Sequence, residues 1–198
     1  MRLALLAALA PPYYLAVSAV ATLLAPKGYR SSSHTMSQLA APGVPHPRII
    51  NAGFIGYSAL VQGLGPLLSR EAGGGWRGRF LWCLVGAYGL GGILAGIFRA
   101  GSFREVAPGV DENTAHRGAS GLAFAAILGL MLLSPFALRP RSKWDRWRAF
   151  SRAMFAATCA FALPFHARPL RPSRGLLQRG VFATTMAWVF ATSLKLRR

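Results

Sequence analysis

Six apolar blocks alternate with short polar stretches along the 198-residue chain. The blocks cover residues 3–25, 49–68, 80–98, 118–138, 149–166 and 176–194. Each is close to the roughly 20 residues that a helix needs to cross a hydrocarbon core of about 30 Å. The pattern therefore predicts an all-α fold, an integral membrane helical bundle with six transmembrane helices. Because the polar stretches are too small to fold separately, we expect a single transmembrane domain over residues 1–198.

The first block can also be interpreted as a signal peptide. Arg2 precedes it, and Val17-Ser18-Ala19 has the form of a small-residue cleavage site. The apolar run exceeds the roughly 7–15 residues of a signal-peptide core, which favours a retained span. Pro11 and Pro12 each lack an amide donor, so we expect them to bend this helix. They are the only candidate break in a span.

Polar side chains inside the blocks need partners within the protein, because the hydrocarbon offers none. The second block carries Asn51, Tyr57, Ser58 and Gln62. In the third block, Gly92 and Gly96 have the GxxxG spacing that lets helix backbones approach closely. We expect these two glycines to serve helix packing rather than to line a ligand groove.

Charge is strongly unbalanced, with 23 Lys and Arg against 5 Asp and Glu in a chain that is 53% hydrophobic. A soluble chain this basic would suggest a nucleic-acid partner. Here the basic residues lie between the apolar blocks, which favours anionic lipid headgroups, so we expect no nucleic acid. The densest basic cluster consists of Arg139, Arg141, Lys143, Arg146 and Arg148. Two Trp residues lie within the same stretch, as is typical of an interfacial anchor. Docking of a partner membrane protein there is the less favoured alternative.

Six spans would place both termini on one side of the membrane. That side carries the densest basic clusters and fewer acids, so the positive-inside rule predicts both termini in the cytoplasm. We expect a protein that is integral to a bacterial-type inner membrane.

The same topology gathers all four histidines on the opposite face. The candidate polar cluster on this face consists of Ser37, His46, Asn51, Asp111, His116 and His166. A histidine beside Asp111 or Glu112, with Ser37 nearby, has the groups needed to hydrolyse a lipid or an amide. Histidine and carboxylate groups also bind zinc, and His116 with His166 can serve as axial ligands of a haem.

No specific motif supports these chemistries, because the chain has no HExxH, no GxSxG and no metal-spaced pair. We therefore assign no catalytic residue and expect no metal and no cofactor. A structural or ligand-binding role is favoured over an enzyme.

Four stretches carry a resemblance to a known family: SHTMSQLAAPG, INAGFIGYSALVQGLGPLL, GILAGIFRAG and TAHRGASGLAFAAILGL. With this order and spacing, the chain resembles the six-span membrane family called domain of unknown function 998 (DUF998). The residues that match the family's motifs are Ser37, Leu39, Asn51, Gly53, Phe54, Gly96, Phe98 and His116. Family members often continue the Gly-x-Phe motif with Pro and a nearby Asp, where this chain has Arg99, Ala100 and Gly101. The resemblance implies a six-helix membrane fold and no assigned chemistry.

A small membrane module that binds a lipid or a partner is the favoured function. The alternative is a membrane-surface hydrolase that uses a His/carboxylate cluster on the non-cytoplasmic face. This hydrolase would need four residues to lie in one cavity: Ser37, Asp111, His116 and His166. A second alternative is a small carrier, which requires a polar path through the bilayer past Asn51, Tyr57 and Gln62.

Overall fold

The apolar blocks of the sequence form helices. The computed structural model describes residues 2–139 and 144–197, apart from the side chains of His166 and Arg168. Its elements in chain order are α1 (Arg2–Leu23), η1 (Met36–Ala40), α2 (Pro47–Val61), α3 (Leu64–Glu71), α4 (Gly75–Ile97), β1 (Glu105–Ala107), β2 (Val110–Asp111), α5 (Glu112–Ala137), α6 (Asp145–Ala162), η3 (Leu163–His166), η4 (Arg168–Ser173) and α7 (Arg174–Arg197). The expected all-α fold is confirmed. The apolar pattern did not predict the short antiparallel hairpin of β1 and β2.

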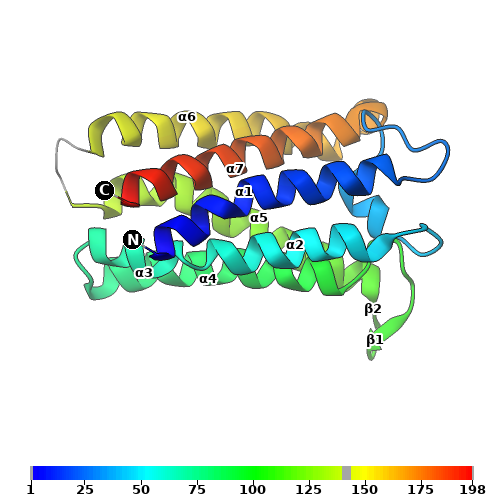
Figure 1. Ribbon diagram of the computed structural model, residues 1–198, viewed down its shortest axis with the longest axis horizontal. Helices are drawn as coiled ribbons and strands as arrows, with labels where there is room; N and C mark the ends of the chain where they lie inside the picture. The colour runs from blue at the N-terminus through cyan, green and yellow to red at the C-terminus, as the bar shows by residue number, and fades with distance from the viewer. Residues whose placement is uncertain (1, 140–143, 198) are drawn as a thin grey trace.

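The long helices pack side by side in a closed ring that follows chain order. α1 contacts α2, α2 contacts α4, α4 contacts α5, α5 contacts α6, α6 contacts α7, and α7 returns to α1. α3 follows α2 and packs on α4. Both termini lie at one end of the bundle, which we call the terminal end (Figure 1). The other end, which we call the crossing end, carries the α1–α2 connection and the hairpin.

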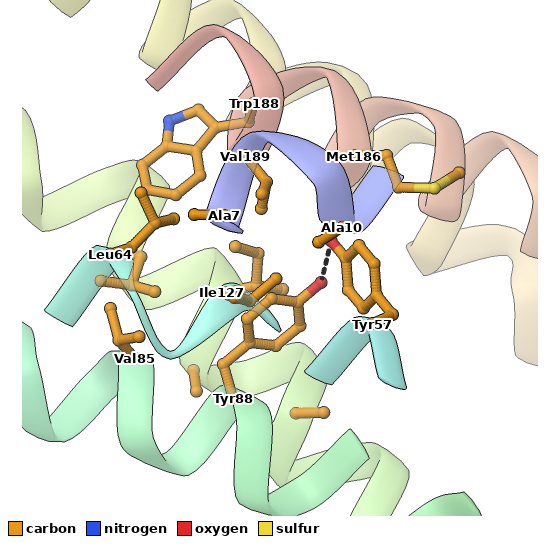
Figure 2. Packing of buried hydrophobic residues seen from close by; sticks show 14 of the residues in the cluster. Ala7, Ala10, Tyr57, Leu64, Val85, Tyr88, Ile127, Met186, Trp188 and Val189 are labelled. Carbon is orange, nitrogen blue, oxygen red and sulfur yellow. Dashed lines mark hydrogen bonds between the residues drawn. The ribbon is translucent and has the colours of Figure 1, made fainter. Parts of the chain in front are cut away.

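The centre of the ring is filled by apolar and aromatic side chains from all sides (Figure 2). Tyr57 of α2 and Tyr88 of α4 meet there, and their hydroxyl oxygens are 2.9 Å apart. A buried hydroxyl needs such a partner, since an unpaired one is costly in an apolar interior. Trp188 of α7 is fully buried, and its indole Nε1 donates to Ser151 Oγ of α6 at 2.7 Å.

The GxxxG pair serves helix packing as expected, although Gly92 also lines an interior cavity. A Cβ atom on Gly92 would overlap Ser58 Oγ of α2, and one on Gly96 would lie 2.7 Å from Ile55 Cγ1. Because neither glycine carries a side chain, α4 approaches α2 closely along this stripe.

The expected position of the helix break is wrong. α1 is one continuous helix through Pro11 and Pro12, whereas the second apolar block is divided into α2 and α3. Pro66 has no amide hydrogen to donate to Gln62, one helical turn earlier, so the regular ladder is interrupted there. At the break, Gly63 packs against the start of α1, where an added Cβ would lie 2.6 Å from Leu3 O.

Three helices are long and apolar enough to cross a membrane, judged by length and composition: α1, α4 and α5. The second apolar block misses this criterion because of its break. The chain is therefore an all-α bundle with three candidate membrane spans among the described residues.

The connection between α1 and α2, residues 24–46, which we call the first crossing, packs on the start of α7. Arg179 Nη1 donates to Ser31 O at 2.6 Å and to His34 O at 3.0 Å, and its Nη2 donates to Tyr29 Oη at 2.8 Å. The main-chain N–H of Leu176 donates to Ser32 O at 2.9 Å. The irregular crossing thus finds hydrogen-bond partners for its carbonyl groups on α7, as buried main-chain groups require.

Gly175→Ala should lower the free energy of unfolding of the detergent-solubilised protein by about 1–3 kcal/mol. An added Cβ there would overlap Ser31 O and would lie 2.5 Å from His34 O, so the new methyl group must push the crossing away from α7. Thermal unfolding followed by circular dichroism measures the effect.

Gly121→Ala is the matched control, because nothing lies within 4 Å of a Cβ added at this helical position. It should leave stability unchanged or raise it by about 0.5–1 kcal/mol through the better helix propensity of alanine. Equal midpoints for the two variants would show that the crossing is not seated on α7.

Candidate functional site

A cavity of ≈ 50 Å³ lies inside the ring toward the crossing end. Four helices, α2, α4, α5 and α7, and the short helix η1 contribute to its wall. The hydrogen-bonding side chains around it include Ser37, Ser58, His116, Ser120, Gln178 and Thr185. Aromatic rings, among them Phe54, Phe124 and Phe182, complete the wall. Polar groups from distant parts of the chain therefore converge on one interior space.

His116 is a buried histidine in this wall. It lies one turn inside α5, and its ring Nδ1 is 2.9 Å from both Ala95 O and Phe98 O at the end of α4. Both partners are carbonyl oxygens, which only accept, so Nδ1 carries the proton. The neutral ring then has its lone pair on Nε2. This atom makes no hydrogen bond with any residue that the structure describes.

Gln178 and Ser37 form a second oriented pair. The Gln178 Oε1 atom accepts the main-chain N–H of Met36 at 2.6 Å, which fixes the orientation of the amide. Its Nε2 then donates to Ser37 Oγ at 3.2 Å. Ser37 acts as an acceptor in this contact, and its own hydroxyl proton has no acceptor among the described residues.

A buried ionic network holds the first turn of α5, one turn before His116. Glu112 is 2% exposed. Its Oε2 accepts from Arg99 Nη2 at 3.1 Å, and its Oε1 accepts from Arg104 Nη2 at 2.9 Å. The arginines come from the loop that follows α4, so the network holds the connection between α4 and α5 against the start of α5.

Three predicted site residues do not line the cavity. Asp111 is the N-cap of α5, where its Oδ1 accepts the Thr114 N–H at 2.6 Å, and this hydrogen bond lowers the pKa of Asp111. His46 is exposed at the N-cap position of α2. Asn51 Oδ1 is buried and accepts no hydrogen bond from a described residue. The side chain of His166 lies outside the described part of the structure.

The structure thus brings Ser37 and His116 to one cavity and places His46, Asn51 and Asp111 elsewhere. In residues 2–139 and 144–197, no three His, Cys, Asp or Glu side chains are grouped closely enough to hold a metal ion. The zinc and haem hypotheses therefore gain no support from the described residues.

A family model described as protein of unknown function (DUF998) matches residues 8–195. The chain belongs to the DUF998 family. No curated protein and no solved structure matches it.

Several of the residues that match the DUF998 motifs lie at or near the cavity. Ser37, Phe54 and His116 line it directly. Phe98 contributes the carbonyl oxygen that His116 Nδ1 bonds, and Gly96 allows the close approach of α4 to α2. Motifs that lie far apart in the sequence therefore build one part of the bundle.

Sequence reasoning missed the contribution of α7. Gln178, Phe182 and Thr185 lie in an apolar block that carried no motif, and only the ring closure brings them to Ser37 and His116. A polar Gln inside an apolar block was the one available signal, because such a residue needs an interior partner.

Glu112→Gln should lower the free energy of unfolding in detergent by about 1–2 kcal/mol. The substitution keeps the shape of the side chain but removes the charge that pairs with Arg99 and Arg104. Both arginines are partly exposed and can turn to water, which limits the loss.

Glu105→Gln is the control, since Glu105 is exposed in β1 and its Oε1 only accepts the Gly109 N–H. Its thermal midpoint should stay at the wild-type value. An equal loss for both variants would mean that the buried network adds nothing beyond general surface charge.

Proposed function

We propose that the chain is a six-span membrane protein whose interior cavity binds a small lipid-like ligand. The observation that carries this proposal is the convergence on one cavity of oriented polar groups from α5, α7 and η1, within an otherwise apolar ring. Binding sites of this type are apolar with a few well-placed polar groups.

The six-span topology is supported by the ring and by its outer surface. α2 and α3 together run from residue 47 to residue 71, enough for about 37 Å of helix. Large apolar side chains face outward on helices around the ring. Examples are Leu5 and Leu15 of α1, Trp82 and Leu90 of α4, Leu122 of α5, Phe161 of α6 and Phe190 of α7. An outer surface this apolar fits lipid better than water.

We expect a ligand to enter the cavity from the bilayer between α5 and α7. Phe124 of α5 and Phe182 of α7 meet edge to face at this level, with ring centroids 6.1 Å apart, and both rings are partly exposed. The contacts that Ser151 and Thr158 of α6 make with Met131 lie further toward the terminal end. Rotation of two aromatic side chains would therefore open the cavity.

Hydrolysis has less support than binding. A histidine base must lie within about 2.6–3.2 Å of its nucleophile, and no serine oxygen makes a hydrogen bond with His116 among the described residues. The Asp111 carboxylate accepts from the start of its own helix instead of orienting a histidine.

One observation favours the carrier as a second candidate. The break between α2 and α3 gives the second span a discontinuous helix, a feature of many transporters. Gln62 lies at this break, where its Nε2 is 3.3 Å from Ser58 O and 3.4 Å from Val85 O. A path through the bilayer would need to pass Gln62, whereas from this helix the cavity is lined by Phe54, Tyr57 and Ser58.

We also propose that anionic headgroups bind at the basic cluster of the terminal end. Arg146 is exposed there. Arg148 supports the cluster differently, because its guanidinium donates to Pro135 O, Leu138 O and Arg139 O at the end of α5. Arg141 and Lys143 lie outside the described residues.

Ser120→Phe should abolish co-purification of a bound lipid, because the larger side chain fills the cavity. Native mass spectrometry of protein released from mild detergent measures the fraction that carries a ligand. Leu122→Phe places the same phenyl ring on the same helix but on its exposed outer face, and it should leave that fraction unchanged. Equal occupancy in both variants would exclude the cavity as the binding site.

Reporter fusions test the topology. A fluorescent protein at the C-terminus should be active in the cytoplasm, and an alkaline phosphatase inserted at Gly109, in the turn between β1 and β2, should be active outside it. The reverse pattern would invert the orientation, and activity of both reporters on one side would contradict six spans.

A further inference from the structure

We propose that the cavity binds the carboxyl group of a single-chain fatty acid, with His116 Nε2 and the Ser37 hydroxyl as its two contacts. This inference rests on the proposed ligand-binding function and specifies the ligand. It is carried by three features of the cavity: the hydrogen bonds of His116 Nδ1, the orientation of Gln178, and the size of the space.

The first feature supplies an acceptor. Because Nδ1 of His116 donates to Ala95 O and Phe98 O, this side of the ring is turned to α4. Nε2 is then the ring nitrogen left for the cavity that His116 lines. An acceptor that has no partner among the described residues favours a ligand that brings an O–H or N–H group.

The second feature supplies a donor. Gln178 is locked by the Met36 N–H and donates to Ser37 Oγ, so the proton of Ser37 is free to point at a ligand acceptor. A carboxylic acid offers one O–H donor and one carbonyl acceptor, which matches this pair. Transfer of the acid proton to Nε2 would give a carboxylate and an imidazolium, joined by a charge-assisted hydrogen bond. The two carbonyl oxygens at Nδ1 stabilise the resulting positive charge.

The third feature limits the size of the head group. A volume of ≈ 50 Å³ accommodates a few water-sized groups. A carboxyl group of three heavy atoms fits, whereas the glycerophosphate head of a phospholipid does not. The apolar chain would leave the cavity between Phe124 and Phe182, toward the outer surface of the bundle.

The test is a competition experiment on the full-length protein in detergent. A C16 fatty acid that carries a photoreactive diazirine is cross-linked, and palmitic acid, hexadecanol and methyl palmitate compete for the site. Palmitic acid should compete roughly 10–100-fold better than the methyl ester, because the ester has no proton for His116 Nε2. Hexadecanol, which donates without ionising, should lie between them.

His116→Asn is the decisive variant. The Asn side-chain amide can replace Nδ1 as the donor to Ala95 O and Phe98 O, but it has no atom at the position of Nε2. The advantage of the acid over the methyl ester should disappear, while competition by the ester itself should stay at the wild-type level. Ser37→Ala leaves the helix-end contacts of His116 intact and should reduce the advantage severalfold, so it provides the same test if His116→Asn does not fold.

The outcomes separate the two proposals. If the acid and the methyl ester compete equally in the wild type, or if folded His116→Asn keeps the preference, the carboxyl assignment is overturned. Cross-linking that is still lost in Ser120→Phe would then leave the cavity as a binding site for another lipid. Cross-linking that is equal in Ser120→Phe and Leu122→Phe overturns both proposals.

Discussion

The arrangement of α4 and α5 at the crossing end depends on the hydrogen bonds from His116 Nδ1 to the end of α4. A helix leaves its last carbonyl groups without helical donors, and in an apolar environment these groups need partners from elsewhere. His116 supplies one donor to both Ala95 O and Phe98 O. The same contact joins α4 to α5 and decides which ring nitrogen faces the interior. The chemistry of the cavity is therefore a consequence of how a helix end is satisfied. The Arg99–Glu112–Arg104 network supports this arrangement, because it holds the first turn of α5.

The irregular first crossing poses the same problem on the other side of the cavity. Its carbonyl groups have no helix or sheet to pair with, and α7 supplies the donors instead. Arg179 reaches Ser31 O and His34 O, while its neighbour Gln178 reaches Met36 N and Ser37 Oγ. Two consecutive residues of one helix thus hold the crossing and place a serine at the cavity. Gly175 makes this possible, since a side chain there would collide with the crossing.

The apolar pattern predicted the helices well, because burial in lipid or in a core imposes long apolar blocks. It failed at the break in the second block, where the position of Pro66 relative to Gln62 was more informative than the conspicuous Pro11-Pro12 pair. For the site, Ser37 and His116 could be predicted to share one end of the bundle, since both follow from the order of the spans. Asp111 could not be separated from them, because an N-cap carboxylate and a catalytic one have the same sequence signature. The roles of Gln178 and Phe182 depend on ring closure between α7 and α1, a long-range contact that no local pattern encodes.

The small residues around the cavity help to interpret it. Its volume is ≈ 50 Å³. Ala95 and Ala123 border the space, so a single larger aliphatic residue at either position would fill part of it. The small residues on α4 and α5 are explained only in part by helix packing. Gly91 does need the close approach, with an added Cβ 2.6 Å from Ala119 O and 3.0 Å from Ala123 Cβ, whereas the small side chain of Ala95 also leaves room in the cavity. His116 Nε2 and the Ser37 hydroxyl proton have no partner among the described residues. A ligand that fills the space would pair with both, which is the physical argument for binding as the function of this bundle.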